Sequence, residues 1–272
     1  MTNKVIITLA PTGNVPTKEK NPYTPVTPQE IADQIYACWR EGAAVAHIHA
    51  RDADGKPTVD REVYRAILER LAEHKDCDII TQLSTGARGG AGFFARGAMV
   101  SLEPEMASLS TGSSNFPTQC NFNDPETIAY LAGEMAKHKV KPEVEVFDAA
   151  MIANAVDLHK KGVIQAPLQF NLVMGVPGSI PATAKNLFFL YESLPPGCPW
   201  TITAVGPQHV DLMTMALALG GNVRVGLEDN IYYAKGILAD NPSLVRRAKG
   251  IILAMGKEVA TPAEARQMLS LI

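Results

Sequence analysis

Two histidines separated by a single residue, His47 and His49, are the side chains of this sequence best suited to hold a metal ion. They end an apolar run, and side chains two apart in a strand point to the same side, so both imidazoles can face one ion. The alternative interpretation is that one or both are hydrogen-bonded histidines of the core. We favour the metal site because the pair stands where a buried strand is expected to end.

A second group of charged side chains follows another apolar run, in Arg224-Val225-Gly226-Leu227-Glu228-Asp229-Asn230. Glu228 can complete a site of two histidines and one glutamate, which leaves positions open for water or substrate. Ligands that offer nitrogen and oxygen suit zinc best, with manganese, cobalt or iron as further candidates. The competing interpretation is that Glu228 and Asp229 cap the segment that follows. Three charged groups within so few residues favour a functional role.

Hydroxyl-bearing side chains and glycine end two further apolar runs. Ser84, Thr85 and Gly86 follow the first of them, and Ser108 begins the stretch 108–112 at the end of the second. Small residues let the backbone approach an anion closely, so a phosphate or a carboxylate can bind there. The same composition also describes an ordinary turn.

Two glutamates, Glu143 and Glu145, share one face of another apolar run. Burying a carboxylate inside a protein costs free energy unless the group is paired. We therefore expect at least one of them to have a functional role or to form an ion pair with an inward-facing arginine or lysine.

All these residues stand at or just after short apolar runs of the kind that form buried strands, and eight such runs alternate with helix-forming sequence. We predict strands at 4–10, 44–49, 78–83, 105–109, 143–147, 168–172, 200–205 and 222–226. We predict helices from 27 to near 42 and at 60–74, 124–137, 151–161, 183–193, 209–219 and 244–255, with a last one opening at 261. A glycine-rich loop, 86–92, follows the third strand. The long loop 11–25 is expected to fold over the site.

Alternating strands and helices give a parallel sheet with right-handed connections, and eight units predict an α/β fold closed as a single (β/α)8 barrel. A doubly wound open sheet is the rival, but it favours a G-x-G-x-x-G turn after the first strand. Here that strand ends in Ala10-Pro11-Thr12-Gly13-Asn14. No linker or internal repeat divides the sequence, so we expect one domain over residues 1–272.

Composition argues against several other classes of protein. The chain has 272 residues, 46% of them hydrophobic and 19% charged, and its net charge is −3. Nucleic acids and membrane surfaces need a concentrated basic patch, which this balance does not offer. The four cysteines form no CxxC pair, and the first apolar stretch is too short for a signal peptide or a membrane span. We expect a cytoplasmic enzyme with no nucleic-acid or membrane partner.

Taken together, these motifs make the sequence similar to the β-keto acid cleavage enzyme family, whose founding activity is the cleavage of 3-keto-5-aminohexanoate. The resemblance covers essentially the whole chain. It includes APTG (10–13), PVTPQE (25–30), HIHARD (47–52), QLSTG (82–86), KPEVE (141–145), GVPG (175–178) and RVGLEDN (224–230). The HIHARD and RVGLEDN motifs are specific in combination.

The resemblance implies a TIM barrel that holds Zn2+ through His47, His49 and Glu228. It also implies a reaction without water, in which a β-keto acid and acetyl-CoA give acetoacetate and a new acyl-CoA. The keto acid chelates the zinc, and Asp229 removes the proton between its two carbonyl groups, with Arg224 positioning and tuning that acid. The enolate attacks the thioester, CoA moves to the original ketone carbon, and a retro-Claisen step releases acetoacetate.

The resemblance also assigns residues to the substrate. Ser84, Thr85 and Gly86 are expected to hold its carboxylate. Ser108 stands where the family has a hydroxyl of the site, and Glu145 matches a glutamate of the family site. The resemblance further implies a homo-oligomer, either a dimer or a tetramer.

One position departs from the family pattern. The aminohexanoate enzyme has a glutamate just after the Thr-Gly of the first loop, where it binds the amino group of the substrate. This chain has Asn14 there, followed by Val15. A cationic tail loses its partner, so we expect a substrate with a neutral or weakly polar tail that Asn14 contacts.

Two other functions fit the same residues. A metal-dependent aldolase or hydrolase shares the metal site but needs no CoA, so the dependence of product formation on acetyl-CoA separates the two. A non-catalytic metal-binding or acyl-binding barrel binds metal without turning over any keto acid. The hypothesis of a non-catalytic barrel does not explain the pair Arg224 and Asp229.

Overall fold

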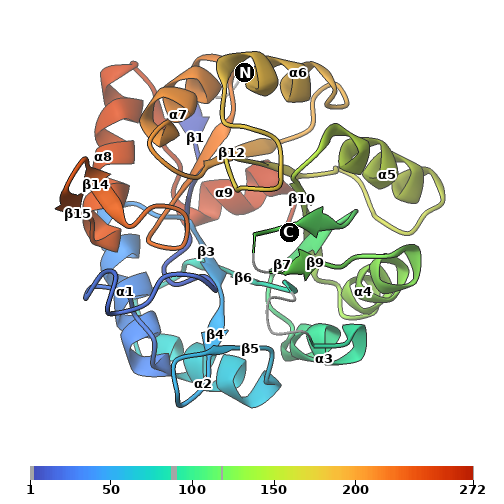
Figure 1. Ribbon diagram of the computed structural model, residues 1–272, viewed down its shortest axis with the longest axis horizontal. Coiled ribbons are helices and arrows are strands. Elements are labelled where there is room, and N and C mark those ends of the chain that lie inside the picture. The colour runs from blue at the N-terminus through green and yellow to red at the C-terminus, as the bar shows by residue number, and fades with distance from the viewer. Residues whose placement is uncertain (1–2, 87–90, 118, 272) are drawn as a thin grey trace.

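The computed structural model describes residues 3–86, 91–117 and 119–271. Parallel strands close into an eight-stranded barrel in the order β10-β11-β12-β13-β2-β3-β6-β7, and helices surround it (Figure 1). The strands are β2 (Ile7–Leu9), β3 (Val45–Ile48), β6 (Ile80–Leu83), β7 (Met106–Ser110), β10 (Lys141–Val146), β11 (Phe170–Met174), β12 (Trp200–Ala204) and β13 (Asn222–Val225). The predicted (β/α)8 barrel is confirmed, and the doubly wound open sheet is excluded.

The helices lie close to their predicted positions, and the first and the last of them begin at the capping threonines that the sequence indicates. Thr27 accepts a hydrogen bond from the backbone of Glu30, whose side chain accepts one from the backbone of Thr27, and Thr261 and Glu264 repeat this arrangement. The helices are α1 (Pro28–Glu41), α2 (Arg61–Ala72), α4 (Pro125–Lys137), α5 (Ala149–Lys160), α6 (Ala184–Glu192), α7 (His209–Ala218), α8 (Asn241–Ala254) and α9 (Pro262–Leu269).

Several short elements differ from the sequence-based prediction. Helix α3 (Phe93–Gly97) and the 3-10 helix η1 (Ala98–Leu102) connect β6 to β7, where only a glycine-rich loop was expected; residues 87–90 of that loop lie outside the described residues. The first predicted strand is divided, because β1 (Lys4–Val5) pairs with β16 (Glu258–Val259) rather than within the barrel. Three small antiparallel pairs are β4 (Ala50–Arg51) with β5 (Pro57–Thr58), β8 (Ser114–Asn115) with β9 (Cys120–Asn121), and β14 (Tyr232–Ala234) with β15 (Ile237–Leu238).

Strand β3 shows how the fold positions the site. Side chains alternate between the two faces of a strand, so Ile48 and His47 point in opposite directions. Ile48 belongs to the apolar cluster that includes Ile31 and Ile35 of α1. His47 is therefore directed into the barrel, where it is fully buried.

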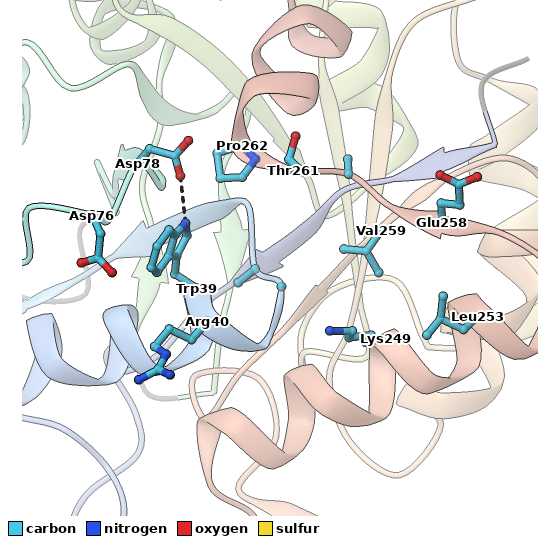
Figure 2. A pocket seen from close by; sticks show the side chains of 13 residues that line it. Trp39, Arg40, Asp76, Asp78, Lys249, Leu253, Glu258, Val259, Thr261 and Pro262 are labelled. Carbon is cyan, nitrogen blue, oxygen red and sulfur yellow. Dashed lines mark hydrogen bonds between the residues drawn. The ribbon is translucent and has the colours of Figure 1, made fainter.

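A wide hollow of about 720 Å³ lies at the amino-terminal end of the barrel strands, between the end of α1 and helix α8 (Figure 2). Two of its acidic side chains are engaged with neighbours: Asp78 accepts a hydrogen bond of 2.9 Å from Nε1 of Trp39, and Glu258 lies 2.6 Å from Nζ of Lys4. This end of a (β/α)8 barrel usually serves stability, whereas chemistry occurs at the opposite end. None of the helices in the described ranges is long and apolar enough to cross a bilayer.

Candidate active site

The two histidines and Glu228 meet at the carboxyl end of the barrel. Nε2 of His47 lies 3.3 Å from Nε2 of His49, and Oε1 of Glu228 lies 3.3 Å from His49 and 3.8 Å from His47. Within the part of the chain that the structure describes, this is the one cluster of three such side chains whose ligand atoms all lie within 4.8 Å. Strand β2 pairs with both β3 and β13, which brings these distant residues together.

The donor set of this cluster fits a divalent cation. Burial, together with the charge of Arg224, lowers the pKa of His47 to about 3, so its imidazole is neutral and can act as a ligand. Although burial raises the pKa of Glu228, the charge of Arg224 and the contacts with the histidines hold it well below its ordinary value. Oε2 of Glu228 is buried and has no hydrogen-bond partner among the described residues. Two imidazoles and one carboxylate are a typical zinc ligand set.

Arg224 of β13 connects three carboxylates beside this cluster. Its Nε and Nη2 donate to the two oxygens of Asp229 over 3.0 and 2.9 Å, and Nη2 also donates to Glu228 over 2.7 Å. Nη1 lies 3.5 Å from Oε1 of Glu145, close enough for an ion pair. We expected at least one of Glu143 and Glu145 to have a functional role or to pair with an inward-facing arginine or lysine, and Glu145 forms such an ion pair.

Burial and neighbouring charges set the pKa of Asp229. Burial raises it, Arg224 lowers it and Glu228 raises it, with a net rise to about 6. The arginine therefore acts in the predicted direction, but burial and the negative charge of Glu228 outweigh it. Asp229 is still ionised at neutral pH, and it is a stronger base than an ordinary aspartate.

The hydroxyl residues divide into a layer that faces the pocket and a layer behind it. Ser84 and Gly86 line the pocket, together with Asn14 from the long first loop. Thr85 and Ser108 bond to each other instead: the Thr85 hydroxyl donates to the carbonyl of Ser108, and the Thr85 backbone donates to the Ser108 hydroxyl. These two side chains hold the loop from behind.

The pocket that contains these residues has a volume of about 450 Å³ at the carboxyl end of the barrel. Its polar groups converge from several strands, while much of its wall is apolar, as in many small-molecule sites. The loop 11–25 contributes Asn14 and Lys20 to the wall, so the expectation that it folds over the site is confirmed. Large apolar residues of the wall are Phe116, Phe147, Val173, Val176, Val205 and Ile231.

Two buried arginines support the site, and neither was predicted to do so from the sequence. Arg51 donates to the carbonyls of Gly13 and Pro16 over 2.8 and 2.9 Å, which fixes the first loop against the end of β3. Arg96 of α3 donates to the carbonyl of Thr85 over 2.7 Å. Arg51 belongs to the HIHARD motif, and this was a usable signal; Arg96 had none, because its helix was not predicted.

The fold and the site define a (β/α)8-barrel enzyme with a candidate metal centre and a buried carboxylate base at the carboxyl ends of its strands. The sequence model of the beta-keto acid cleavage enzyme family matches residues 4–271, and the chain belongs to this family.

Individual relatives agree with this assignment. The chain is 43% identical to a 3-keto-5-aminohexanoate cleavage enzyme of Fusobacterium nucleatum, over 100% of this chain and 99% of that protein. It is 39% identical to a 3-oxoadipate:acetyl-CoA acetyltransferase of Cupriavidus necator, over 100% and 96%. Among solved structures, the apo structure of ObcA superposes with a TM-score of 0.79 at 24% identity, covering 92% of this chain and 66% of that one, and it supports the fold.

Proposed function

We propose that this enzyme uses Zn2+ to condense a β-keto acid with acetyl-CoA, giving acetoacetate and a new acyl-CoA. The observation that carries the proposal is the position of Asp229, a buried base held by Arg224 directly beside the cluster of His47, His49 and Glu228. Relatives that cover nearly the whole chain are named as acetyl-CoA transferases of keto acids, which supports the choice of acetyl-CoA as second substrate.

The residues of the pocket account for the first step. When bound between His47, His49 and Glu228, a divalent cation supplies Lewis acidity that makes the carbon between two carbonyl groups easier to deprotonate. Asp229 accepts that proton, and its pKa of about 6 suits a base that works near neutral pH. Arg224 keeps both oxygens of Asp229 oriented through its Nε and Nη2.

The later steps return the proton. The carbanion attacks the thioester carbon of acetyl-CoA, so a carbon–carbon bond forms and the carbon–sulfur bond breaks. The CoA thiolate then attacks the original ketone carbon, and cleavage of the adjacent carbon–carbon bond leaves the new acyl-CoA and the enolate of acetoacetate, which takes the proton back from Asp229 to give acetoacetate. Glu145 lines the same pocket, and burial raises its pKa to about 7, so it can exchange a proton during these steps. Ser84 and Gly86 lie on the wall where the substrate carboxylate is expected.

We propose a neutral or weakly polar substrate tail. The carboxylates on the pocket wall, Glu145, Glu228 and Asp229, all lie within ion-pair distance of Arg224, so an ammonium group finds no free acid there. The apolar wall and the amide of Asn14 suit an uncharged tail instead.

Lys20 supports a second candidate, a tail that ends in a carboxylate. It lines the pocket with an exposed side chain, and no acidic group of the described ranges forms an ion pair with it. The percentage of sequence identity does not distinguish an amino tail from a carboxylate tail. Relatives with similar identities, 43% and 39%, are named for 3-keto-5-aminohexanoate and for 3-oxoadipate, respectively.

A panel of β-keto acids with neutral, carboxylate and amino tails, each assayed with and without acetyl-CoA, tests the function. We expect acetoacetate to form only with acetyl-CoA and fastest from neutral tails, and Asp229→Asn to lower kcat by at least about 100-fold. The matched control is Asp157→Asn on the outer surface of α5, which should keep full activity. Product without acetyl-CoA would instead indicate an aldolase or a hydrolase, and preference for the amino tail would contradict the proposed tail.

We further propose one catalytic domain over residues 1–272, a homo-oligomer of two or four chains, and a cytoplasmic location. The strands of one closed barrel come from most of the length of the chain, from β2 to β13, which supports the single domain.

The location and the assembly are proposed on other grounds. The free cysteines are Cys38, Cys77, Cys120 and Cys198, and free cysteines are usual in a reducing compartment. Light scattering of the purified protein tests the oligomer, and elemental analysis of the protein purified without added metal tests zinc.

A further inference from the structure

A chain of buried polar groups lies behind the metal ligand His47. Nδ1 of His47 is 2.7 Å from Oε1 of Gln82 in β6, and Nε2 of Gln82 is 3.0 Å from Oε2 of Glu143 in β10. The other oxygen of Glu143 accepts a hydrogen bond of 2.8 Å from Nε2 of Gln169, just before β11. Each of these four side chains is at least 97% buried, so water does not replace any of these contacts.

Glu143 is unusual because it is a buried acid without a cation. No lysine, arginine or histidine in the described part of the chain lies within 4.0 Å of its carboxylate; Arg224, the nearby cation, contacts Glu145, Glu228 and Asp229 instead. A buried carboxylate costs free energy that an apolar residue would not, and the hydrogen bonds of two amides offset this cost only in part. Gln82 lies between Glu143 and the metal ligand His47, so the carboxyl group can act on His47 through this amide.

The direction of the hydrogen bonds follows from the chemistry of each group. Both oxygens of Glu143 accept from amide Nε2 atoms, those of Gln82 and Gln169, so Gln82 turns its NH2 group towards Glu143. Its carbonyl oxygen then faces His47, which must donate from Nδ1. In this tautomer Nε2 carries no proton, and Nε2 is the atom that faces His49 and Glu228.

We propose that Glu143 is a positioning residue that fixes, through Gln82, the tautomer of His47 whose Nε2 is free to bind metal. Without the carboxylate, the amide of Gln82 can rotate by half a turn and donate to Nδ1, which places the proton of His47 on Nε2. A partner of the second ring nitrogen commonly governs how a histidine ligand binds metal, and its loss lowers metal affinity about 10- to 100-fold. The inference rests on the proposed metal site, but the tautomer exists before any metal binds.

The first measurement is the tautomer of His47 in the metal-free enzyme, by long-range 15N–1H NMR of protein labelled at histidine. The chain has six histidines, and the spectrum of His47→Gln identifies the signal of His47. We expect the Nδ1–H form in the wild type and a mixture of forms in Glu143→Gln, together with zinc affinity lowered about 10- to 100-fold. The matched control, Gln169→Met, removes the other amide from Glu143 and should leave the tautomer unchanged.

A swap of the two groups separates this role from a merely structural one. In the double variant Gln82→Glu with Glu143→Gln, the carboxylate stands beside Nδ1 and accepts from it directly. We expect the Nδ1–H form and zinc affinity to return to near the wild-type values, whereas a structural role predicts the combined damage of both changes.

Three results would overturn the inference: an Nε2–H form in the wild type, an unchanged tautomer in Glu143→Gln, or a folded swap variant that does not recover. If Glu143→Gln does not fold, the tautomer of His47 in the wild type and in the double variant still tests the inference. A tautomer that responds as expected in a protein that binds no zinc would contradict the proposed metal function and leave the positioning role intact.

Discussion

Glu145 is a buried carboxylate beside Arg224, whose Nη1 lies 3.5 Å away. Burial raises its pKa from 4.5 to about 7, although the charge of Arg224 lowers it. Because the folded pKa lies above the unfolded one, the contribution to stability is complete below pH 4.5 and is lost as the pH rises through 7. Relative to Glu145→Gln, the metal-free wild type should lose about 3 kcal/mol of unfolding free energy over this window, since one pKa unit corresponds to about 1.4 kcal/mol. Urea unfolding at several pH values measures this, and parallel pH profiles of the two proteins would contradict it.

His47 should matter to the metal far more than to the fold. We expect His47→Ala to weaken zinc binding by at least about 100-fold, because two ligands remain of three. The far-ultraviolet circular dichroism should match that of the wild type. His138→Ala, at the partly buried end of α4 and outside the metal cluster, is the matched control and should keep its zinc. Full zinc content in His47→Ala would show that the ligand set is wrong.

The residues of the site differ in how far the sequence could predict them. His47, His49 and Glu228 were predictable because metal ligands are few in type and stand at strand ends. The supporting contacts of Arg51 and Arg96 were not, because their partners are mostly backbone carbonyls, which any residue type provides. The hydrogen bonds from Gln82 to Glu143 and between Gln82 and His47 depend on how the side-chain amide of Gln82 is oriented. Only the folded structure defines this orientation, so the sequence could not predict these contacts.

At the scale of elements, alternation and caps predicted most of the barrel, and the misses have local causes. Helix α3 is short and has no side-chain cap at Gly92, so it gives neither an amphipathic period nor a start signal. Helix α8 begins at Asn241 rather than 244, with Asp240 as its cap, a signal that precedes the apolar positions on which the prediction relied. Strand β1 belongs to a separate pair because its partner β16 follows α8, which no local pattern reveals.

The first loop approaches the metal cluster so closely that only glycine fits at position 13. Gly13 has a φ of +61°, and a Cβ there would lie 2.3 Å from Cγ of Glu228. We expect Gly13→Ala to displace Glu228, lower zinc affinity at least about 10-fold and cost about 1 kcal/mol of stability. Calorimetric titration with zinc measures the first effect. Gly162→Ala is the matched control, because its φ is +75° with no atom within 4 Å, so it should lose stability without losing zinc affinity. Equal zinc affinity in both variants would contradict the argument.

For the whole molecule, the barrel closes where its first strand, β2, meets its last, β13. Only three residue pairs join them, from Val223 with Ile7 to Val225 with Leu9. The backbone of Glu228 also donates to the carbonyl of Ala10, which follows β2. His47 and His49 lie in and just after β3, and Glu228 follows β13, so a metal bound to all three connects the two strands that flank β2. It therefore links the first and the last strands of the barrel.

Because zinc bridges this closure, it should stabilise the entire barrel against unfolding. At a free concentration about 100 times its dissociation constant, a ligand that binds only the folded state adds about 2.7 kcal/mol, and for a chain of this size we expect Tm to rise by about 5 to 10 °C. Differential scanning calorimetry of chelator-treated protein, with and without added zinc, measures the shift. In His47→Ala the same zinc should leave Tm nearly unchanged, because the bridge between β3 and the segment after β13 is broken. An equal rise in both proteins would mean that zinc acts at some other place on the surface.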